Sequence, residues 1–237
     1  MLAVVIPTLN EKDSIGGLIN RLIELHLAAI LIVDDGSTDG TAEIVGSLSK
    51  EHSEVHLLKR SGEKGLGRAY ADGFRHLLQY APPEIDTIVQ MDADNSHDPA
   101  VIPEMLEKIK EGYDLILGSR YIQGGKIEKW NWFRRIVSRF GNYYARLILW
   151  LPIKDLTGGF KCWRRSLLEK IVSRPLNSLG YVFQIETTYR AHKLGAKITE
   201  IPITFTERKL GGSKFSLKII LEAYLGVIKL KFKKTNE

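Results

Sequence analysis

The chain has 237 residues, of which 44% are hydrophobic and 26% are charged, and its formal net charge is +6. This length and composition are typical of a folded, soluble α/β protein with a hydrophobic core, so we expect residues 1–237 to form a single domain. Cys162 is the one cysteine, which excludes an intrachain disulfide and fits a reducing compartment.

The positive charge is concentrated in two segments. Residues 126–150 contain six basic residues against one acidic residue, and residues 208–237 contain eight against two. Localised charge of this kind indicates an anionic partner such as phosphate, a nucleotide or a lipid surface. No uncharged run reaches the ~18–20 residues that cross a bilayer, so we expect no membrane span. The strand-like run that directly follows Met1 predicts that there is no signal peptide.

The first 120 residues alternate between strand and helix patterns. Short β-branched runs indicate strands over 3–7, 30–34, 55–59, 87–91 and 115–118. Helical patterns lie between them, over 14–25, 41–49, 67–80 and 100–111. This alternation predicts an α/β fold with a mostly parallel central sheet flanked by helices. Ligands of such sheets bind at the carboxyl ends of the strands, so we expect the polar loops there to meet. These loops cover residues 8–11, 34–41 and 92–99.

Three further elements are predicted in the second half of the chain. They are an aromatic and basic helix over 130–151, a strand over 198–206, and a helix over 217–233 with an apolar face and a basic end. Aromatic residues mixed with cations are typical of interfacial helices, so both helices are candidates for contact with a membrane surface. Alternatively, the apolar stripe of the first helix packs on the core of its own domain. This stripe consists of positions 132, 136, 140, 143 and 147.

Two aspartates flank a small residue directly after the fourth predicted strand. The carboxylates of Asp92 and Asp94 can face one cation together, and oxygen ligands suit Mg²⁺ or Mn²⁺. A metal at this position would neutralise a departing diphosphate. The alternative is a solvated loop with helix-capping acids, since Asp98 before Pro99 is a natural N-cap. The tripeptide alone leaves both interpretations open.

Two earlier loops also carry acidic side chains at strand ends. In the segment 34–41, Asp35 can accept hydrogen bonds from a nucleotide base or ribose. The alternative there is a capped turn before the next helix. In the segment 7–11, Glu11 is placed to reach a ligand, and Asn10 is a candidate helix cap.

These strand-end motifs occur in a characteristic order along the first half of the chain. They are Val5-Ile6-Pro7-Thr8-Leu9-Asn10-Glu11, Val33-Asp34-Asp35-Gly36-Ser37-Thr38-Asp39-Gly40-Thr41, Met91-Asp92-Ala93-Asp94 and Gly118-Ser119-Arg120-Tyr121. In this order and spacing they resemble the inverting family-2 glycosyltransferases, which implies a GT-A fold.

Motifs in the second half narrow the resemblance to dolichol- or polyprenol-phosphate mannose synthases. They are Asp155-Leu156-Thr157-Gly158-Gly159-Phe160-Lys161, Gly180-Tyr181-Val182-Phe183-Gln184-Ile185-Glu186 and Glu200-Ile201-Pro202-Ile203-Thr204-Phe205, followed by Arg208 and Gly212-Ser213-Lys214.

This resemblance implies roles for individual residues. Those that would line the nucleotide pocket are Pro7, Leu9, Glu11, Val33 and Asp35. Those that would hold Mg²⁺ or Mn²⁺ and the diphosphate are Asp92, Ala93 and Asp94. Those that would contact phosphate groups are Arg120, Arg208 and Lys214. Two positions depart from the family. It usually has Tyr where this chain has Leu9, and a metal-ligating Gln where this chain has Ser96. We keep Ser96 as a third candidate metal ligand.

The implied reaction transfers mannose from GDP-mannose to dolichol or polyprenol phosphate with inversion. The acceptor phosphate is already negative, so its attack needs positioning and charge neutralisation but no carboxylate base. Arginine can hold two phosphate oxygens, which makes Arg120 and Arg134 the acceptor-phosphate candidates, with Ser138 one helical turn beyond. Asp94, Arg120 and Arg134 are therefore the catalytic candidates. We expect a peripheral protein on the cytoplasmic face of a membrane, where a separate anchoring subunit could hold it.

Other functions fit parts of the sequence. A polyprenyl-phosphate glucosyltransferase that uses UDP-glucose would share these motifs, and so would a non-catalytic subunit that binds lipid or nucleotide. A processive polysaccharide synthase would carry a Gln-x-x-Arg-Trp motif and membrane spans, and we find neither. We expect no nucleic-acid partner, because the acidic strand-end loops would repel a phosphate backbone.

Overall fold

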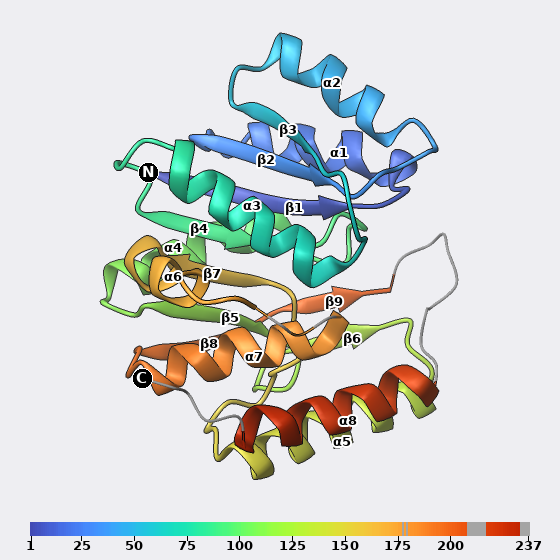
Figure 1. Ribbon diagram of the computed structural model, residues 1–237, viewed down its shortest axis with the longest axis vertical. Helices are drawn as coiled ribbons and strands as arrows, with labels where there is room; N and C mark the ends of the chain where they lie inside the picture. The colour runs from blue at the N-terminus through green and yellow to red at the C-terminus, as the bar shows by residue number, and fades with distance from the viewer. Residues whose placement is uncertain (177, 179, 208–216, 233–237) are drawn as a thin grey trace.

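The computed structural model describes residues 1–176, 178, 180–207 and 217–232 (Figure 1). Its centre is a seven-stranded sheet with the order β3-β2-β1-β4-β7-β5-β8. The strands of this sheet are β1 (Leu2–Thr8), β2 (Ala29–Asp34), β3 (Val55–Lys59), β4 (Thr87–Gln90), β5 (Leu115–Ser119), β7 (Lys161–Arg164) and β8 (Ile198–Pro202). A small second sheet pairs β6 (Lys126–Glu128) with β9 (Thr204–Thr206) in parallel.

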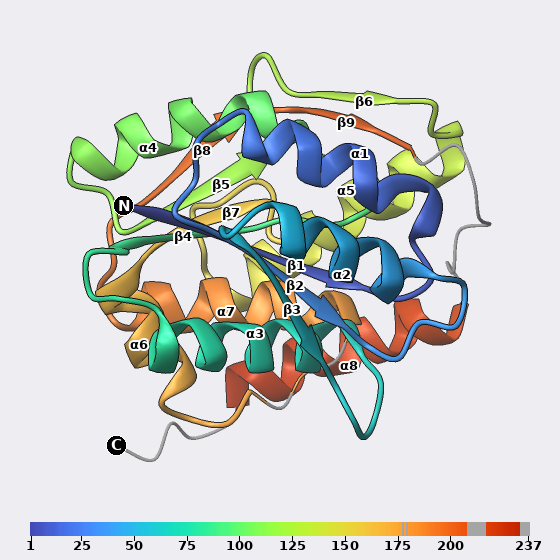
Figure 2. The same cartoon turned by 90° about the horizontal axis from the view of Figure 1, so that it is seen from above.

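Helices cover both faces of the central sheet (Figure 2). On one face lie α1 (Lys12–Ile23), α2 (Thr41–Glu51) and α4 (Ile102–Lys110), which follows a short 3-10 turn, η1 (Pro99–Val101). On the other face lie α3 (Leu66–Tyr80), α6 (Arg165–Val172) and α7 (Gly180–Lys193). Two further helices, α5 (Trp132–Leu149) and α8 (Leu217–Phe232), run side by side at the edge of this second layer (Figures 1 and 2).

The core explains the apolar runs of the central strands. Every residue of β1 and β2 is buried, as expected for parallel strands that are covered on both faces. Because side chains alternate along a strand, Val4 and Ile6 face the α1 layer, while Ala3 and Val5 face the α3 layer. The prediction of a mostly parallel α/β sheet flanked by helices is confirmed.

One strand of the central sheet was not predicted. β7 lies antiparallel between β4 and β5. It begins with Lys161 and ends with an arginine, so its pattern does not indicate a buried strand. Lys161 is nevertheless fully buried, because its ammonium donates to the Gln184 carbonyl at 2.7 Å and to the hydroxyls of Thr187 and Thr188 at 3.0 Å each. These three hydrogen bonds replace the water that the charged group loses.

The strand predicted over 198–206 is divided in two. β8 pairs with β5 and ends at Pro202, which has no N–H to continue a ladder. The Ile203 N–H then donates to the Ser119 carbonyl at 3.0 Å, and β9 turns away to pair with β6. The split brings β9 beside the segment that leads into α5.

The apolar stripe of α5 points away from the core. The exposed fractions of Trp132, Ile136, Phe140, Tyr143 and Leu147 are 73%, 56%, 57%, 60% and 61%. The alternative in which this stripe packs on the domain's own core is therefore wrong. The buried side of the helix consists of Asn142, Ala145 and Leu149.

α5 and α8 together form one exposed apolar surface. The Tyr144 hydroxyl of α5 donates to the Tyr224 carbonyl of α8 at 3.2 Å, and the two rings lie 4.4 Å apart between centroids. α8 adds exposed Leu225, Ile228 and Phe232 to the stripe of α5. Among the described residues, no helix is long and apolar enough to cross a membrane.

Candidate active site

The loops after β1 and β2 are joined at the carboxyl edge of the sheet. The Asn10 N–H donates to Ser37 Oγ, and the Thr38 N–H donates to Asn10 Oδ1, each at 2.9 Å. The Glu11 N–H donates to Thr41 Oγ1 at 2.9 Å. The prediction that the strand-end loops meet is confirmed for these two loops. Asn10 serves to join the loops, and α1 begins without a side-chain cap.

The residues predicted to line a nucleotide pocket lie around these loops. Pro7 and Val33 are partners in the parallel register of β1 and β2, and both are buried. Val33 is fully enclosed in the apolar cluster beneath α3, so it can offer a ligand its backbone only. Leu9 is half-buried, and Glu11 Oε2 accepts a hydrogen bond from the Ser14 hydroxyl at 3.1 Å. Leu9 and Glu11 thus present side chains at the edge.

Asp35 is held by a residue that the sequence analysis missed. Its carboxylate forms an ion pair with Arg60 and accepts a hydrogen bond from the Gly65 N–H at 2.6 Å. Arg60 also donates to Asp72 of α3 at 2.7 Å. Arg60 lies just after β3 in no recognisable motif, so only the three-dimensional arrangement reveals it. Together these contacts fix the Asp35 carboxylate at the sheet edge.

The predicted metal ligands lie in one turn after β4. Asp92 Oδ1 accepts a hydrogen bond from the Tyr70 hydroxyl at 2.9 Å. Asp94 Oδ1 accepts from the Ser96 N–H at 3.1 Å and from the Ser96 hydroxyl at 2.5 Å. Asn95, with φ of 59°, supplies the left-handed residue of the turn. The structure therefore brings Asp92, Asp94 and Ser96 together. Ala93 between them is buried, and Asp98 caps η1 as predicted.

Two buried side chains that were not predicted support this turn. His97 Nδ1 accepts a hydrogen bond from the Asp92 N–H at 3.2 Å, and its ring stacks on Phe160. Burial lowers the pKa of His97, although nearby carboxylates oppose the shift, so the neutral imidazole carries its proton on Nε2. Burial and Asp92 raise the pKa of Tyr70 well above its ordinary value, which keeps its hydroxyl a donor. His97 could have been suspected from its place in the loop, whereas Tyr70 comes from α3 and has no local signal.

The donors in this turn fit a hard divalent cation. They are two carboxylates and a hydroxyl, all of them oxygen ligands. Within the described part of the chain, no three His, Cys, Asp or Glu side chains are grouped so that they could hold a metal. A cation would therefore need further oxygens from a ligand, as Mg²⁺ does when it binds substrate phosphates. A Cβ at Gly159 would lie 3.0 Å from Asp92 Oδ2, so glycine preserves the space of this carboxylate.

Arg120 forms a buried ion pair at the end of β5. Its Nε and Nη2 donate to the two carboxylate oxygens of Asp155 at 2.7 Å each, and Nη2 also donates to Thr157 Oγ1 at 2.8 Å. Burial alone would raise the pKa of Asp155, but the charge and hydrogen bonds of Arg120 outweigh it and leave the pKa below its ordinary value. Asp155 thus fixes the orientation of the Arg120 guanidinium, which is predicted to contact a phosphate group.

The loop that carries Asp155 also reaches the acidic turn. Asn142 of α5 and Glu200 of β8 accept hydrogen bonds of 2.7 to 3.2 Å from the backbone N–H groups of residues 154–157. Four residues after Asp155, Gly159 lies against Asp92. The motif that begins at Asp155 therefore orients Arg120 at one end and accommodates the Asp92 carboxylate at the other.

Arg134 and Arg120 both contact the ring of Trp130. The guanidinium carbons of Arg120 and Arg134 lie 5.5 and 4.2 Å from the centroid of Trp130, in cation–π contact. Arg134 also forms an ion pair with Glu207. Nε1 of Trp130 is buried and has no hydrogen-bond partner within the described residues. Two of the three acceptor-phosphate candidates are therefore adjacent.

Ser138 completes this cluster. It lies one turn after Arg134 on α5, and its Oγ accepts a hydrogen bond from the Tyr121 hydroxyl at 2.7 Å. Tyr121 directly follows Arg120, so all three acceptor-phosphate candidates gather around Trp130 and Tyr121.

One aromatic ring links the acidic turn to this cationic cluster. Phe205 of β9 contacts the edge of His97 at 5.6 Å between centroids, and it lies 5.4 Å from the guanidinium carbon of Arg120. The carboxylates of the acidic turn, which suit a metal and a diphosphate, thus lie near Arg120, which suits a second phosphate. The predicted phosphate ligands Arg208 and Lys214 fall outside the described residues.

Two relatives are similar to the chain over most of its length. The chain is 41% identical over 229 residues to polyprenol monophosphomannose synthase of Mycolicibacterium smegmatis, with 94% of this chain and 84% of that protein covered. It is 40% identical over 224 residues to undecaprenyl-phosphate mannosyltransferase of Micrococcus luteus, with 94% and 90% covered.

Solved structures share the fold. Glucosyl-3-phosphoglycerate synthase of Mycobacterium tuberculosis, in complex with Mn²⁺, UDP and phosphoglyceric acid, matches with a TM-score of 0.71 and 18% identity over 98% of this chain and 78% of that one. The same enzyme with Mg²⁺ and UDP matches with a TM-score of 0.69 and 19% identity, and 98% and 79% of the two chains are covered. The model of glycosyl transferase family 2 matches residues 3–172. The chain therefore belongs to glycosyltransferase family 2.

Proposed function

We propose that this protein transfers mannose from GDP-mannose to the phosphate of a polyprenyl phosphate, with inversion at the anomeric carbon. The observation that carries the proposal is the loop from Asp155 to Gly159, which contacts the acidic turn at Asp92 and orients Arg120 in the arginine cluster. The names of the two relatives support mannose as the sugar and a polyprenyl phosphate as the acceptor.

The donor nucleotide binds at the carboxyl edge of β1, β2 and β4. Pro7, Leu9, Glu11, Val33 and Asp35 line the nucleotide end, and Asp35 offers a carboxylate that Arg60 already orients. Asp92, Ala93 and Asp94 lie at the diphosphate end, with Ser96 beside Asp94. When bound there, Mg²⁺ or Mn²⁺ supplies the positive charge that stabilises the departing diphosphate.

The acceptor phosphate binds beside Trp130, where Arg120 and Arg134 neutralise its charge and Ser138 offers a hydroxyl. One phosphate oxygen attacks the anomeric carbon from the face opposite the GDP. A new carbon–oxygen bond forms, the bond to the diphosphate oxygen breaks, and its electron pair leaves with GDP. No proton moves, so the site needs no general base. Because Asp155 fixes Arg120 before the substrate arrives, this charge needs little reorganisation during the reaction.

The surface formed by the exposed side chains of α5 and α8 docks on a membrane. Exposed aromatic and aliphatic residues there would enter the interfacial region of a bilayer and bring the acceptor cluster near lipid phosphate. We propose the cytoplasmic face as its location and expect binding without a partner. Trp132→Asp, at a residue that is 73% exposed, should weaken vesicle binding without unfolding the protein. Unchanged binding in a flotation assay would contradict membrane docking, and binding only with a second protein would indicate a separate anchoring subunit.

A donor screen tests the proposed reaction. Purified protein is incubated with Mn²⁺, undecaprenyl phosphate and either radiolabelled GDP-mannose or radiolabelled UDP-glucose, and the lipid fraction is counted. We expect labelled lipid from GDP-mannose alone, and no labelled lipid with Asp94→Ala. Product from UDP-glucose alone would identify a glucosyltransferase. Binding of donor and lipid without product from either donor would favour a non-catalytic subunit.

A further inference from the structure

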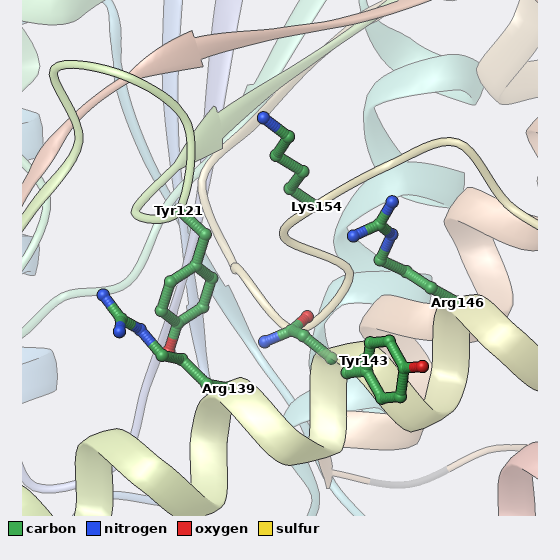
Figure 3. Close-up of a pocket in the computed structure, with 6 residues that line it drawn as sticks. Tyr121, Arg139, Tyr143, Arg146 and Lys154 are labelled. Carbon is green, nitrogen blue, oxygen red and sulfur yellow. The ribbon is translucent and has the colours of Figure 1, made fainter.

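A second basic site lies on α5 and borders the acceptor cluster at Tyr121. It is a hollow of about 230 Å³ between α5 and the loop that follows it (Figure 3). Arg139 and Arg146 enter from the helix, Lys154 enters from the loop, and Tyr121 closes one side. The residues that line it are Tyr121, Arg139, Asn142, Tyr143, Arg146 and Lys154.

Among the described residues, the cations of this hollow have no acidic partners. In the described part of the chain, the side chains of Arg139, Arg146 and Lys154 make no ion pair, whereas Arg120 and Arg134 each have one. Nε of Arg146 is buried and has no hydrogen-bond partner there. Three like charges around one hollow repel one another unless an anion lies between them. Guanidinium groups are well suited to phosphate oxygens, so a phosphate is the anion that this lining favours.

Two lining side chains, Tyr121 and Asn142, lie on the side of the hollow that faces Arg120, and the Tyr121 ring lies 5.3 Å from the guanidinium carbon of Arg120 and 5.9 Å from that of Arg139. Asn142 forms its wall and donates to Thr157 Oγ1 at 3.0 Å. Thr157 Oγ1 in turn accepts a hydrogen bond from Arg120. The Asn142–Thr157 contact and the Tyr121 ring would therefore lie between a phosphate in the hollow and the Arg120 guanidinium.

The hollow adjoins the apolar stripe of α5. Tyr143 lines the hollow and also belongs to that stripe, with 60% of its surface exposed. Arg139 and Arg146 are two helical turns apart, so they lie on the same side of α5 as Tyr143 between them. If the stripe enters the interface of a bilayer, the hollow comes to the level of the lipid headgroups.

We infer that this hollow binds the phosphodiester of an anionic phospholipid and orients the docked protein. The inference rests on the membrane docking proposed above. It commits to a bilayer phospholipid and not to the polyprenyl phosphate acceptor, because the Asn142–Thr157 contact and the Tyr121 ring lie between the hollow and Arg120.

The test compares vesicle binding by two variants with the same charge. Arg139→Gln/Arg146→Gln removes two cations from the hollow. The control, Lys229→Gln/Lys231→Gln, removes two exposed cations from the last turn of α8, outside the hollow. Affinities are measured by flotation with vesicles of neutral phosphatidylcholine and with vesicles that also contain phosphatidylglycerol. Lys154→Gln, in the exposed loop, is a third variant that leaves α5 intact, and thermal unfolding checks that each variant is folded.

We expect the variant of the hollow to lose about tenfold more affinity for phosphatidylglycerol vesicles than the control, since it also loses charge-assisted hydrogen bonds. Both should keep wild-type affinity for neutral vesicles. Equal losses would show general charge attraction only and would overturn the inference. So would a loss confined to vesicles in which undecaprenyl phosphate is the anionic lipid, because the hollow would then hold the acceptor. If the wild type does not bind neutral vesicles, the proposed docking of α5 and α8 on a membrane is refuted instead. If the protein transfers no mannose, the proposed reaction is refuted, and the comparison of vesicle affinities still stands.

Discussion

Replacing Asp155 by asparagine would remove the buried carboxylate that pairs with the Arg120 guanidinium. The Asp155 carboxylate is fully buried and accepts hydrogen bonds from Arg120 Nε, Nη2 and backbone N–H at 2.7, 2.7 and 3.0 Å. Breaking such a pair by removing one partner costs about 3–5 kcal/mol of unfolding free energy. For a chain of 237 residues, each kcal/mol lowers Tm by roughly 2–4 °C, so we expect a fall of about 6–20 °C.

Thermal unfolding followed by circular dichroism measures this loss. The matched control is Asp98→Asn, which removes an exposed ion pair with Arg21 but leaves a side-chain oxygen that can cap η1. Exposed pairs contribute less than about 1 kcal/mol, so the control should stay near the wild-type Tm. If Asp155→Asn falls no further than the control, the Arg120–Asp155 pair does not fix the arginine cluster, and the assignment of Arg120 as a preoriented cation fails.

Three other outcomes follow from the same contacts. Because Arg120 holds the pKa of Asp155 below its usual value, the pair stabilises the fold above about pH 4 and is lost as pH falls through the folded-state pKa. Acid unfolding of Asp155→Asn should therefore be less steep with pH than that of the wild type, and equal slopes would contradict the pairing. In Gly159→Ala, the added Cβ would clash with the Asp92 carboxylate and should raise the Mn²⁺ concentration for half-maximal turnover about tenfold. An unchanged Mn²⁺ concentration would exclude that contact. Tyr70→Phe removes a hydrogen-bond donor to Asp92 and should reduce Mn²⁺ affinity by about fivefold, which is equivalent to about 1 kcal/mol. A Mn²⁺ titration measures this affinity, and a wild-type value for the variant would refute the prediction.

Local pattern predicted most of the fold. The apolar runs of β1 and β2 and the helical spacing of α1 each reflect burial against a neighbouring layer, which leaves a periodic trace in the sequence. β7 leaves no such trace. Its Lys161 is buried because α7, far along the chain, supplies three acceptors for the ammonium. A partner so distant in sequence cannot be inferred from periodicity.

The candidate site shows the same division. Asp92 and Asp94 could be found because a strand end and an acidic turn are adjacent in the sequence. Tyr70, which donates to Asp92, and Arg60, which pairs with Asp35, come from other elements and were missed. The exposure of the α5 stripe was also undecided, since an amphipathic pattern is the same whether the apolar face meets protein or lipid.

The central claim is that a polyprenyl phosphate oxygen displaces GDP directly at the anomeric carbon. The measurement that tests it most directly is the anomeric configuration of the lipid product formed from GDP-α-mannose by the purified protein with Mn²⁺, read from its carbon–hydrogen coupling by NMR. The account predicts a β-linked mannosyl phosphate. An α-linked product would show retention and contradict single displacement, and the absence of any mannosyl lipid would contradict the proposed reaction itself.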